Sequence, residues 1–125
     1  MSPAAAYLRV LAAFADFDGR ASRAELWGFV LVHGLVTAVL LIASAVVGEL
    51  AGLAWVAGSA VLALYLALTF FPALSAVARR LHDTGRSSWL TVLAVVPPLG
   101  LLVLYWACLP GEPGPNEWGQ RPDSL

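Results

Sequence analysis

The sequence predicts an all-α membrane protein: a small polytopic helical bundle with three transmembrane helices and an interfacial helix at the N-terminus. Of the 125 residues, 60% are hydrophobic and 12% are charged, whereas a globular domain carries roughly 25% charged residues. Three long stretches without a charged side chain, each long enough to cross a bilayer, account for most of the chain. So few charges cannot cover a water-facing surface, so we expect one membrane domain over residues 1–125.

Residues 3–15 predict a short helix that is not long enough to span the bilayer. Tyr7, Leu11 and Phe14 recur at helical spacing, and Arg9 is the only charge in this segment. A helix lying at the membrane surface fits this pattern. Packing against the cytoplasmic ends of the spanning helices is the other interpretation.

The first spanning helix is expected over residues 22–48. Ser22 followed three residues later by Glu25 is a capping box, which marks a helix start. The charge-free part, residues 26–48, would be about 35 Å long and therefore long enough to cross the hydrocarbon. Trp27 lies near its start, where interfacial aromatic residues are common.

The second and third spans follow a tight turn at Glu49. We expect the second over residues 51–71, with a kink at Pro72 and an amphipathic extension that can reach residue 80. The third is expected over residues 89–109, broken at Pro97-Pro98. A single broken crossing is the favoured interpretation, and a re-entrant pair of half-helices is the alternative, because each half of about ten residues is only ~15 Å long.

The arginines predict the orientation of these helices. The turn at Glu49 between the first two spans contains no arginine, and the Pro/Gly-rich tail, residues 110–125, contains only Arg121. By the positive-inside rule, the N-terminus and the polar loop at residues 79–88 are cytoplasmic and the tail is extracytoplasmic. The other six arginines flank the first span or lie in that loop: Arg9, Arg20, Arg23, Arg79, Arg80 and Arg86.

This topology brings two polar stretches, residues 18–25 and 79–86, to one membrane face. Asp83 can pair there with Arg20 or Arg23, and Glu25 with an arginine of the second stretch. Three interpretations remain open: charges that only set topology and lock helix ends, a basic pocket for anionic lipid headgroups, or catalysis by a histidine and an aspartate. The candidates for binding an anion, lipid or partner are Arg20, Arg23, Arg79, Arg80, His82, Asp83 and Arg86; Asp18 and Glu25 are candidates for structural ion pairs.

A second polar set is expected inside the membrane: His33, Thr37, Tyr65 and Thr69. Polar residues within spans usually face other helices, so a neutral His33 bonded to its neighbour is the first interpretation. A path for a proton or a substrate is the second. Neither a metal site nor a cofactor is predicted, since His33, His82 and Cys108 lie far apart in the chain, and a net charge of −1 suggests no nucleic-acid partner.

Four motifs carry a resemblance to a known family: residues 17–27, 78–89, 97–100 and 110–119. Together they resemble domain of unknown function 805, the YhaH-like bacterial inner-membrane proteins, over about residues 7–122. Trp118 stands where the family often has Tyr, and Ser88 where a second Trp is common. The resemblance implies a multi-pass protein of the bacterial inner membrane and implies no activity.

The function predicted is that of a structural or interaction module without an assignable reaction. Its cytoplasmic Arg/Asp/His cluster would bind a partner protein or an anionic lipid headgroup, and a bundle of three helices is thin enough to favour a homo-oligomer or a membrane partner. The alternative is an oligomeric transporter or channel component with His33 and Thr37 lining a path. A lesser alternative is a membrane-embedded enzyme that uses His82 and Asp83.

Overall fold

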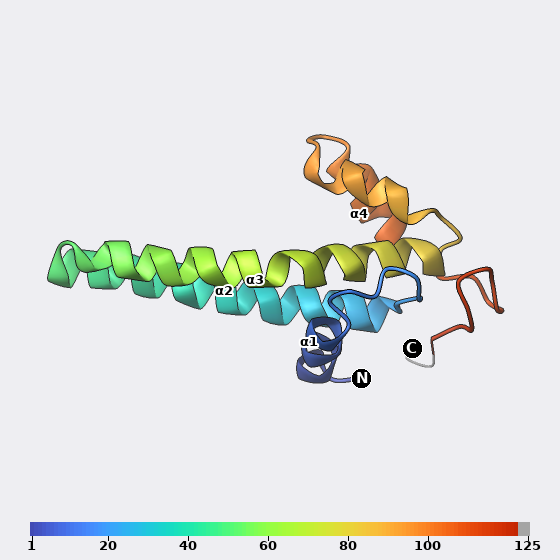
Figure 1. The fold of residues 1–125 in the computed structure, drawn as a ribbon, viewed down its shortest axis with the longest axis horizontal. Coiled ribbons are helices and arrows are strands. Elements are labelled where there is room, and N and C mark those ends of the chain that lie inside the picture. The colour runs from blue at the N-terminus through green and yellow to red at the C-terminus, as the bar shows by residue number, and fades with distance from the viewer. Residues whose placement is uncertain (123–125) are drawn as a thin grey trace.

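The fold is all-helical. The computed structural model describes residues 1–122, and in this range no β-strand is present beyond an isolated bridge between Asn116 and Gly119. Its elements are α1 (Pro3–Ala12), α2 (Arg23–Ala51), α3 (Ala54–Asp83), the 3-10 helix η1 (Ser88–Val95) and α4 (Gly100–Cys108) (Figure 1).

Helices α2 and α3 form a long antiparallel hairpin (Figure 1). The chain reverses at Gly52, whose φ of 58° favours glycine. Farther along, Gly58 lies so close to α2 that an added Cβ would come within 2.7 Å of the Ser44 hydroxyl. Both helices are long and apolar enough to cross a membrane, and side chains such as Leu64 and Leu68 are more than half exposed, as expected for surfaces that contact lipid.

Two predicted boundaries of this hairpin can be compared with the structure. Ser22 is the N-cap of α2 and accepts a hydrogen bond from the Glu25 amide, as the capping box predicts. Helix α3 continues through the buried Pro72 and ends at Asp83, so the extension belongs to the same helix.

The single broken span expected over residues 89–109 is not what the structure shows. Residues 88–108 form the 8-residue η1 and the 9-residue α4, which pack on each other after the turn at Pro97-Pro98. An added Cβ on Gly100 would lie 2.9 Å from the Ala94 carbonyl oxygen, so the two halves are in close contact. This η1–α4 hairpin leaves the end of α3 and returns to it, because Arg80 Nε donates to the Ala107 carbonyl at 3.0 Å. Halves of about 15 Å each are too short to cross, and the re-entrant alternative describes them.

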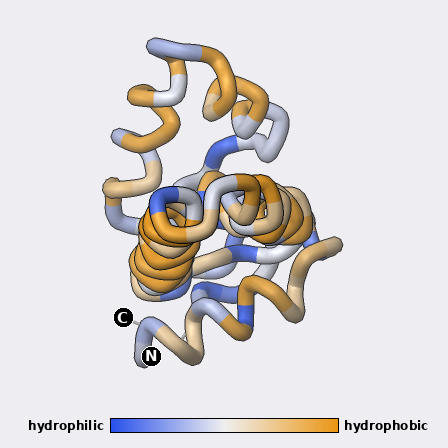
Figure 2. Tube along the Cα trace, turned by 90° about the vertical axis from the view of Figure 1, so that its left-hand side faces the viewer, coloured by the Kyte–Doolittle hydropathy of each residue, from blue (hydrophilic) through white to orange (hydrophobic). Residues whose placement is uncertain are grey.

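Helix α1 packs on the side of α2 and α3 opposite to the η1–α4 hairpin (Figure 2). Ala6 and Val10 are fully buried, and Gly28 of α2 has no room for a side chain, because a Cβ there would lie 2.7 Å from Ala6 Cβ. Leu8 on the outer surface remains 63% exposed. The helix therefore packs against the ends of the spanning helices through one face and leaves its other face free.

The tail lies at the same end of the molecule as the loop that follows α3 (Figure 1). The Glu112 amide donates to the Asp83 carbonyl at 2.7 Å, and Arg20 Nη2 donates to the Glu112 carbonyl at 2.8 Å. The described part of the tail therefore lies beside residues 79–88, and not at the opposite end of the α2–α3 hairpin, where the expected topology put it.

Candidate functional site

The polar end is the name we give to the end of the α2–α3 hairpin at which the loop before α2, the end of α3 and the tail meet. Its central side chains are buried despite their charge. Each retains less than a tenth of its surface exposed: Arg20, Glu25, Arg79, Arg80, His82 and Asp83. Buried charges are costly unless they are paired and hydrogen-bonded, so their partners decide what this end can do.

The Asp83 carboxylate joins two arginines. Arg20 Nε donates to Asp83 Oδ1 at 2.9 Å, Arg20 Nη2 lies 2.9 Å from the same oxygen, and Arg80 contacts Oδ2 through Nη1. Gly111 passes so close that an added Cβ would lie 2.1 Å from Asp83 Oδ2. Two charge-assisted pairs and a backbone in contact therefore hold this carboxylate in place.

Arg80 fastens the η1–α4 hairpin to α3. Its Nε donates to the carbonyl of Ala107, its Nη2 to that of Leu109, and its Nη1 to that of Ala21 at 3.2 Å. The first two carbonyls belong to the C-terminal end of α4, where the helix dipole favours a cation. One side chain of α3 thereby holds both the loop before α2 and the returning end of α4.

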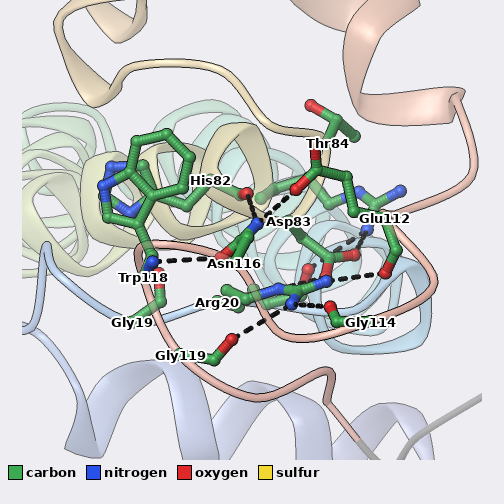
Figure 3. Close-up of polar contacts among 12 residues, drawn as sticks. Gly19, Arg20, His82, Asp83, Thr84, Glu112, Gly114, Asn116, Trp118 and Gly119 are labelled. Atoms are coloured by element: carbon green, nitrogen blue, oxygen red, sulfur yellow. Dashed lines mark hydrogen bonds and ion pairs between the residues drawn. The ribbon is translucent and has the colours of Figure 1, made fainter.

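Arg20 fastens the tail in the same way. Its Nη1 donates to the carbonyls of Gly114 at 2.7 Å and Gly119 at 3.2 Å, in addition to the bond from Nη2 to Glu112 (Figure 3). The tail therefore wraps around a guanidinium group that Asp83 holds in place.

His82 completes the attachment of the tail. Its ring stacks on Trp118 with centroids 4.3 Å apart, and its Nδ1 lies 3.0 Å from the Gly19 carbonyl oxygen (Figure 3). Because a carbonyl only accepts, Nδ1 is the protonated nitrogen. Asn116 donates to the His82 carbonyl at 2.9 Å. Sequence reasoning missed Asn116 and Trp118 as parts of this cluster; the family motif at residues 110–119 was the available signal.

Glu25 and Arg79 form a second buried pair, with Nη1 and Oε1 2.6 Å apart. Within residues 1–122, Arg79 Nε and Nη2 are buried without a hydrogen-bond partner. Three other candidates stay outside the buried cluster. Arg23 and Asp18 are exposed, and Arg86 donates to the Thr84 carbonyl and lies over the Trp106 ring.

The polar residues inside the membrane form a separate network. His33 Nδ1 and the Tyr65 hydroxyl are 3.0 Å apart, and that hydroxyl is 3.0 Å from the Tyr7 hydroxyl of α1. Thr69 donates to the Tyr65 carbonyl of its own helix, and the Thr37 hydroxyl is buried without a partner in the described range. The sequence did not indicate Tyr7 as the third member of this network.

Groups able to bind a metal do not assemble in the part of the chain that the structure describes. In that range no three His, Cys, Asp or Glu side chains come together, and Cys108 is exposed. The polar end therefore consists of arginines, carboxylates and carbonyls arranged as a clamp that holds the hairpin, the loop before α2 and the tail together.

Comparison with known proteins identifies the family. The family model described as "Protein of unknown function (DUF805)" matches residues 14–120. The chain belongs to this family. It is 37% identical to the inner membrane protein YhaH of Escherichia coli (strain K12), over 93% of this chain and 94% of that protein. It is 40% identical to the inner membrane protein YhaI of the same strain, over 93% of each chain. No solved structure matches the chain.

Membership in the DUF805 family confirms the resemblance seen in the motifs and agrees with an inner-membrane location. The matched residues include both polar stretches and most of the tail, and so the whole clamp around Asp83.

Proposed function

We propose that this protein is a non-catalytic module of the bacterial inner membrane whose polar end binds the headgroups of anionic lipids. The supporting observation is the position of its exposed arginines. Arg9, Arg23 and Arg121 are exposed at the end of two membrane-length helices, which is the depth of lipid phosphates. The buried clamp beneath them holds the surrounding segments in place.

The arginine distribution supports a cytoplasmic polar end. All seven arginines belong to it, whereas the opposite end of the α2–α3 hairpin carries a single charge, Glu49 near the end of α2. Under the positive-inside rule the polar end, with the described part of the tail, faces the cytoplasm. Among residues 1–122, six carboxylates accompany these arginines, so net charge contributes little attraction and binding depends on local groups.

Apolar side chains beside the polar end fit a position at the membrane interface. Trp89 of η1 is 83% exposed, and Leu8 and Phe14 near α1 are each more than half exposed. Such residues enter the boundary between headgroups and acyl chains.

The other predicted functions have less support. His82 and Asp83 are occupied by Trp118 and by two arginines, which speaks against the enzyme. The bonds of His33 to Tyr65, and of Tyr65 to Tyr7, favour a structural role over a path across the membrane. A partner protein at the polar end is the alternative that the following experiment separates.

The test is mass spectrometry of lipids that copurify with the protein from bacterial membranes. We expect anionic lipids to be enriched over their share of the membrane and the enrichment to disappear when Arg9, Arg23 and Arg121 are together replaced by Gln. Glu49→Gln, at the opposite end of the hairpin, is the control and should keep the enrichment. If the copurifying lipids match the composition of the membrane and a second protein copurifies in stoichiometric amount, the polar end binds a protein partner and the lipid proposal is wrong.

A further inference from the structure

Arg20 and Arg79 use different edges of their guanidinium groups. The Nε–Nη2 edge of Arg20 faces Asp83, with both nitrogens 2.9 Å from Oδ1. Arg79 instead binds Glu25 through Nη1, and within the described residues its own Nε–Nη2 edge has no partner although the side chain is almost fully buried. This edge is the one that receives a carboxylate or a phosphate side-on.

The charges of the buried clamp do not balance. Arg20, Arg79 and Arg80 are buried with only two buried carboxylates, those of Glu25 and Asp83. The clamp therefore carries one positive charge in excess in a region from which water is largely removed. A bound anion would stabilise both the buried cation that lacks a counter-charge and the guanidinium edge that lacks a hydrogen-bond partner.

A cavity of about 320 Å³ lies between α1, the end of α3 and the tail, and Arg79 is one of the residues that line it. Arg79 lines it together with Arg9 from α1 and Arg121 from the tail, both of which are exposed. Its charged lining comprises Arg9, Arg20, Arg79, Arg121, Asp16 and Glu25, an excess of two positive charges.

We propose that this cavity binds a phosphate group, held side-on by Nε and Nη2 of Arg79 and covered by Arg9 and Arg121. A carboxylate offers two oxygens in one plane, whereas a phosphate offers further oxygens to donors arriving from other directions. The phosphate comes either from a lipid headgroup or from a soluble phosphate. As a lipid site this inference rests on the function proposed above, and as a site for soluble phosphate it does not.

The first arm of the test uses inorganic phosphate. The full chain is placed in nanodiscs of phosphatidylcholine and titrated by isothermal calorimetry. Arg79→Lys keeps a cation for Glu25 but removes the fork, so we expect affinity to fall about tenfold or more. Arg9→Gln with Arg121→Gln leaves the buried pairs intact and should also weaken binding. Arg23→Gln, an exposed arginine outside this cavity, should leave binding unchanged.

The second arm uses nanodiscs that contain phosphatidic acid and no free phosphate, with retained lipid measured by mass spectrometry. Arg79-dependent binding in either arm supports the site and identifies the source of the phosphate. The absence of saturable binding in both arms, or equal binding by the wild type and Arg79→Lys, overturns it. If lipid enrichment survives in Arg79→Lys, the proposed lipid-binding function stands but the Arg79 site does not. If phosphate binds without any lipid enrichment, the Arg79 site stands but the lipid-binding function does not.

Discussion

The ring of His82 lies flat on the ring of Trp118, with their centroids 4.3 Å apart and their planes 6° apart. The contact joins the last turn of α3 to the tail and covers a histidine that is 2% exposed. Because the chain before Trp118 also bonds to Arg20 and to the His82 carbonyl, the tail is part of the folded polar end.

Replacement of Trp118 by Ala should loosen the tail. Loss of an aromatic stack costs about 0.5–1.5 kcal/mol beyond the lost burial. We expect limited proteolysis in detergent to cleave Trp118→Ala faster after residue 109 than the wild type, while Trp118→Tyr behaves as the wild type. Equal cleavage rates for all three proteins would mean that the stack does not hold the tail.

The re-entrant hairpin predicts that the loop after α3 and the tail lie on one side of the membrane. In a Cys108→Ser background, Ser87→Cys and Gln120→Cys should react with an impermeant thiol reagent from the same side, and Glu49→Cys from the other. Membrane vesicles of known orientation provide the measurement. If Gln120→Cys is instead labelled from the same side as Glu49→Cys, the chain crosses the membrane a third time between residues 87 and 120.

Neutralising Asp83 should destabilise the protein strongly. Asp83→Asn leaves the buried guanidinium groups of Arg20 and Arg80 without their shared carboxylate. Removal of one partner of a buried ion pair costs about 3–5 kcal/mol. We expect a large fall in the thermal unfolding midpoint in detergent.

The matched control for this change is Asp18→Asn. Asp18 is exposed and, within residues 1–122, makes no ion pair, so its neutralisation should change the midpoint little. Similar midpoints for the two variants would show that the clamp around Asp83 contributes little to stability.

Gly111 should tolerate no side chain. A Cβ there would lie 2.1 Å from Asp83 Oδ2, so Gly111→Ala must displace either the carboxylate or the tail. Overpacking of this kind costs about 1–3 kcal/mol, measurable as a lower unfolding midpoint.

Gly114→Ala is the control, because nothing lies within 4 Å of the Cβ position at Gly114. A midpoint for Gly111→Ala as high as that of Gly114→Ala would contradict the close contact between the tail and Asp83.

Local patterns predicted the long helices well. Ser22 and Glu25 indicated where α2 starts, and the apolar run before Arg79 allowed the helix to extend past Pro72 to residue 80. For residues 89–109 a single broken crossing was favoured over a re-entrant pair, although Pro97-Pro98 interrupts a helix whether the chain crosses or turns back. What decides between the two is the bonding of Arg80 to the carbonyls at the end of α4, a contact between distant parts of the chain.

By itself, the sequence determined that this is a membrane protein, that it has three charge-free stretches of membrane-spanning length, and that its charges gather in a few short stretches. Those properties depend on composition and periodicity, which are local. Only the tertiary structure decided that the last apolar segment turns back, that the tail joins the clamp at the polar end, and that Arg79 retains an open edge. Each of these depends on which carbonyl or carboxylate meets which guanidinium group, and that is set by packing in three dimensions.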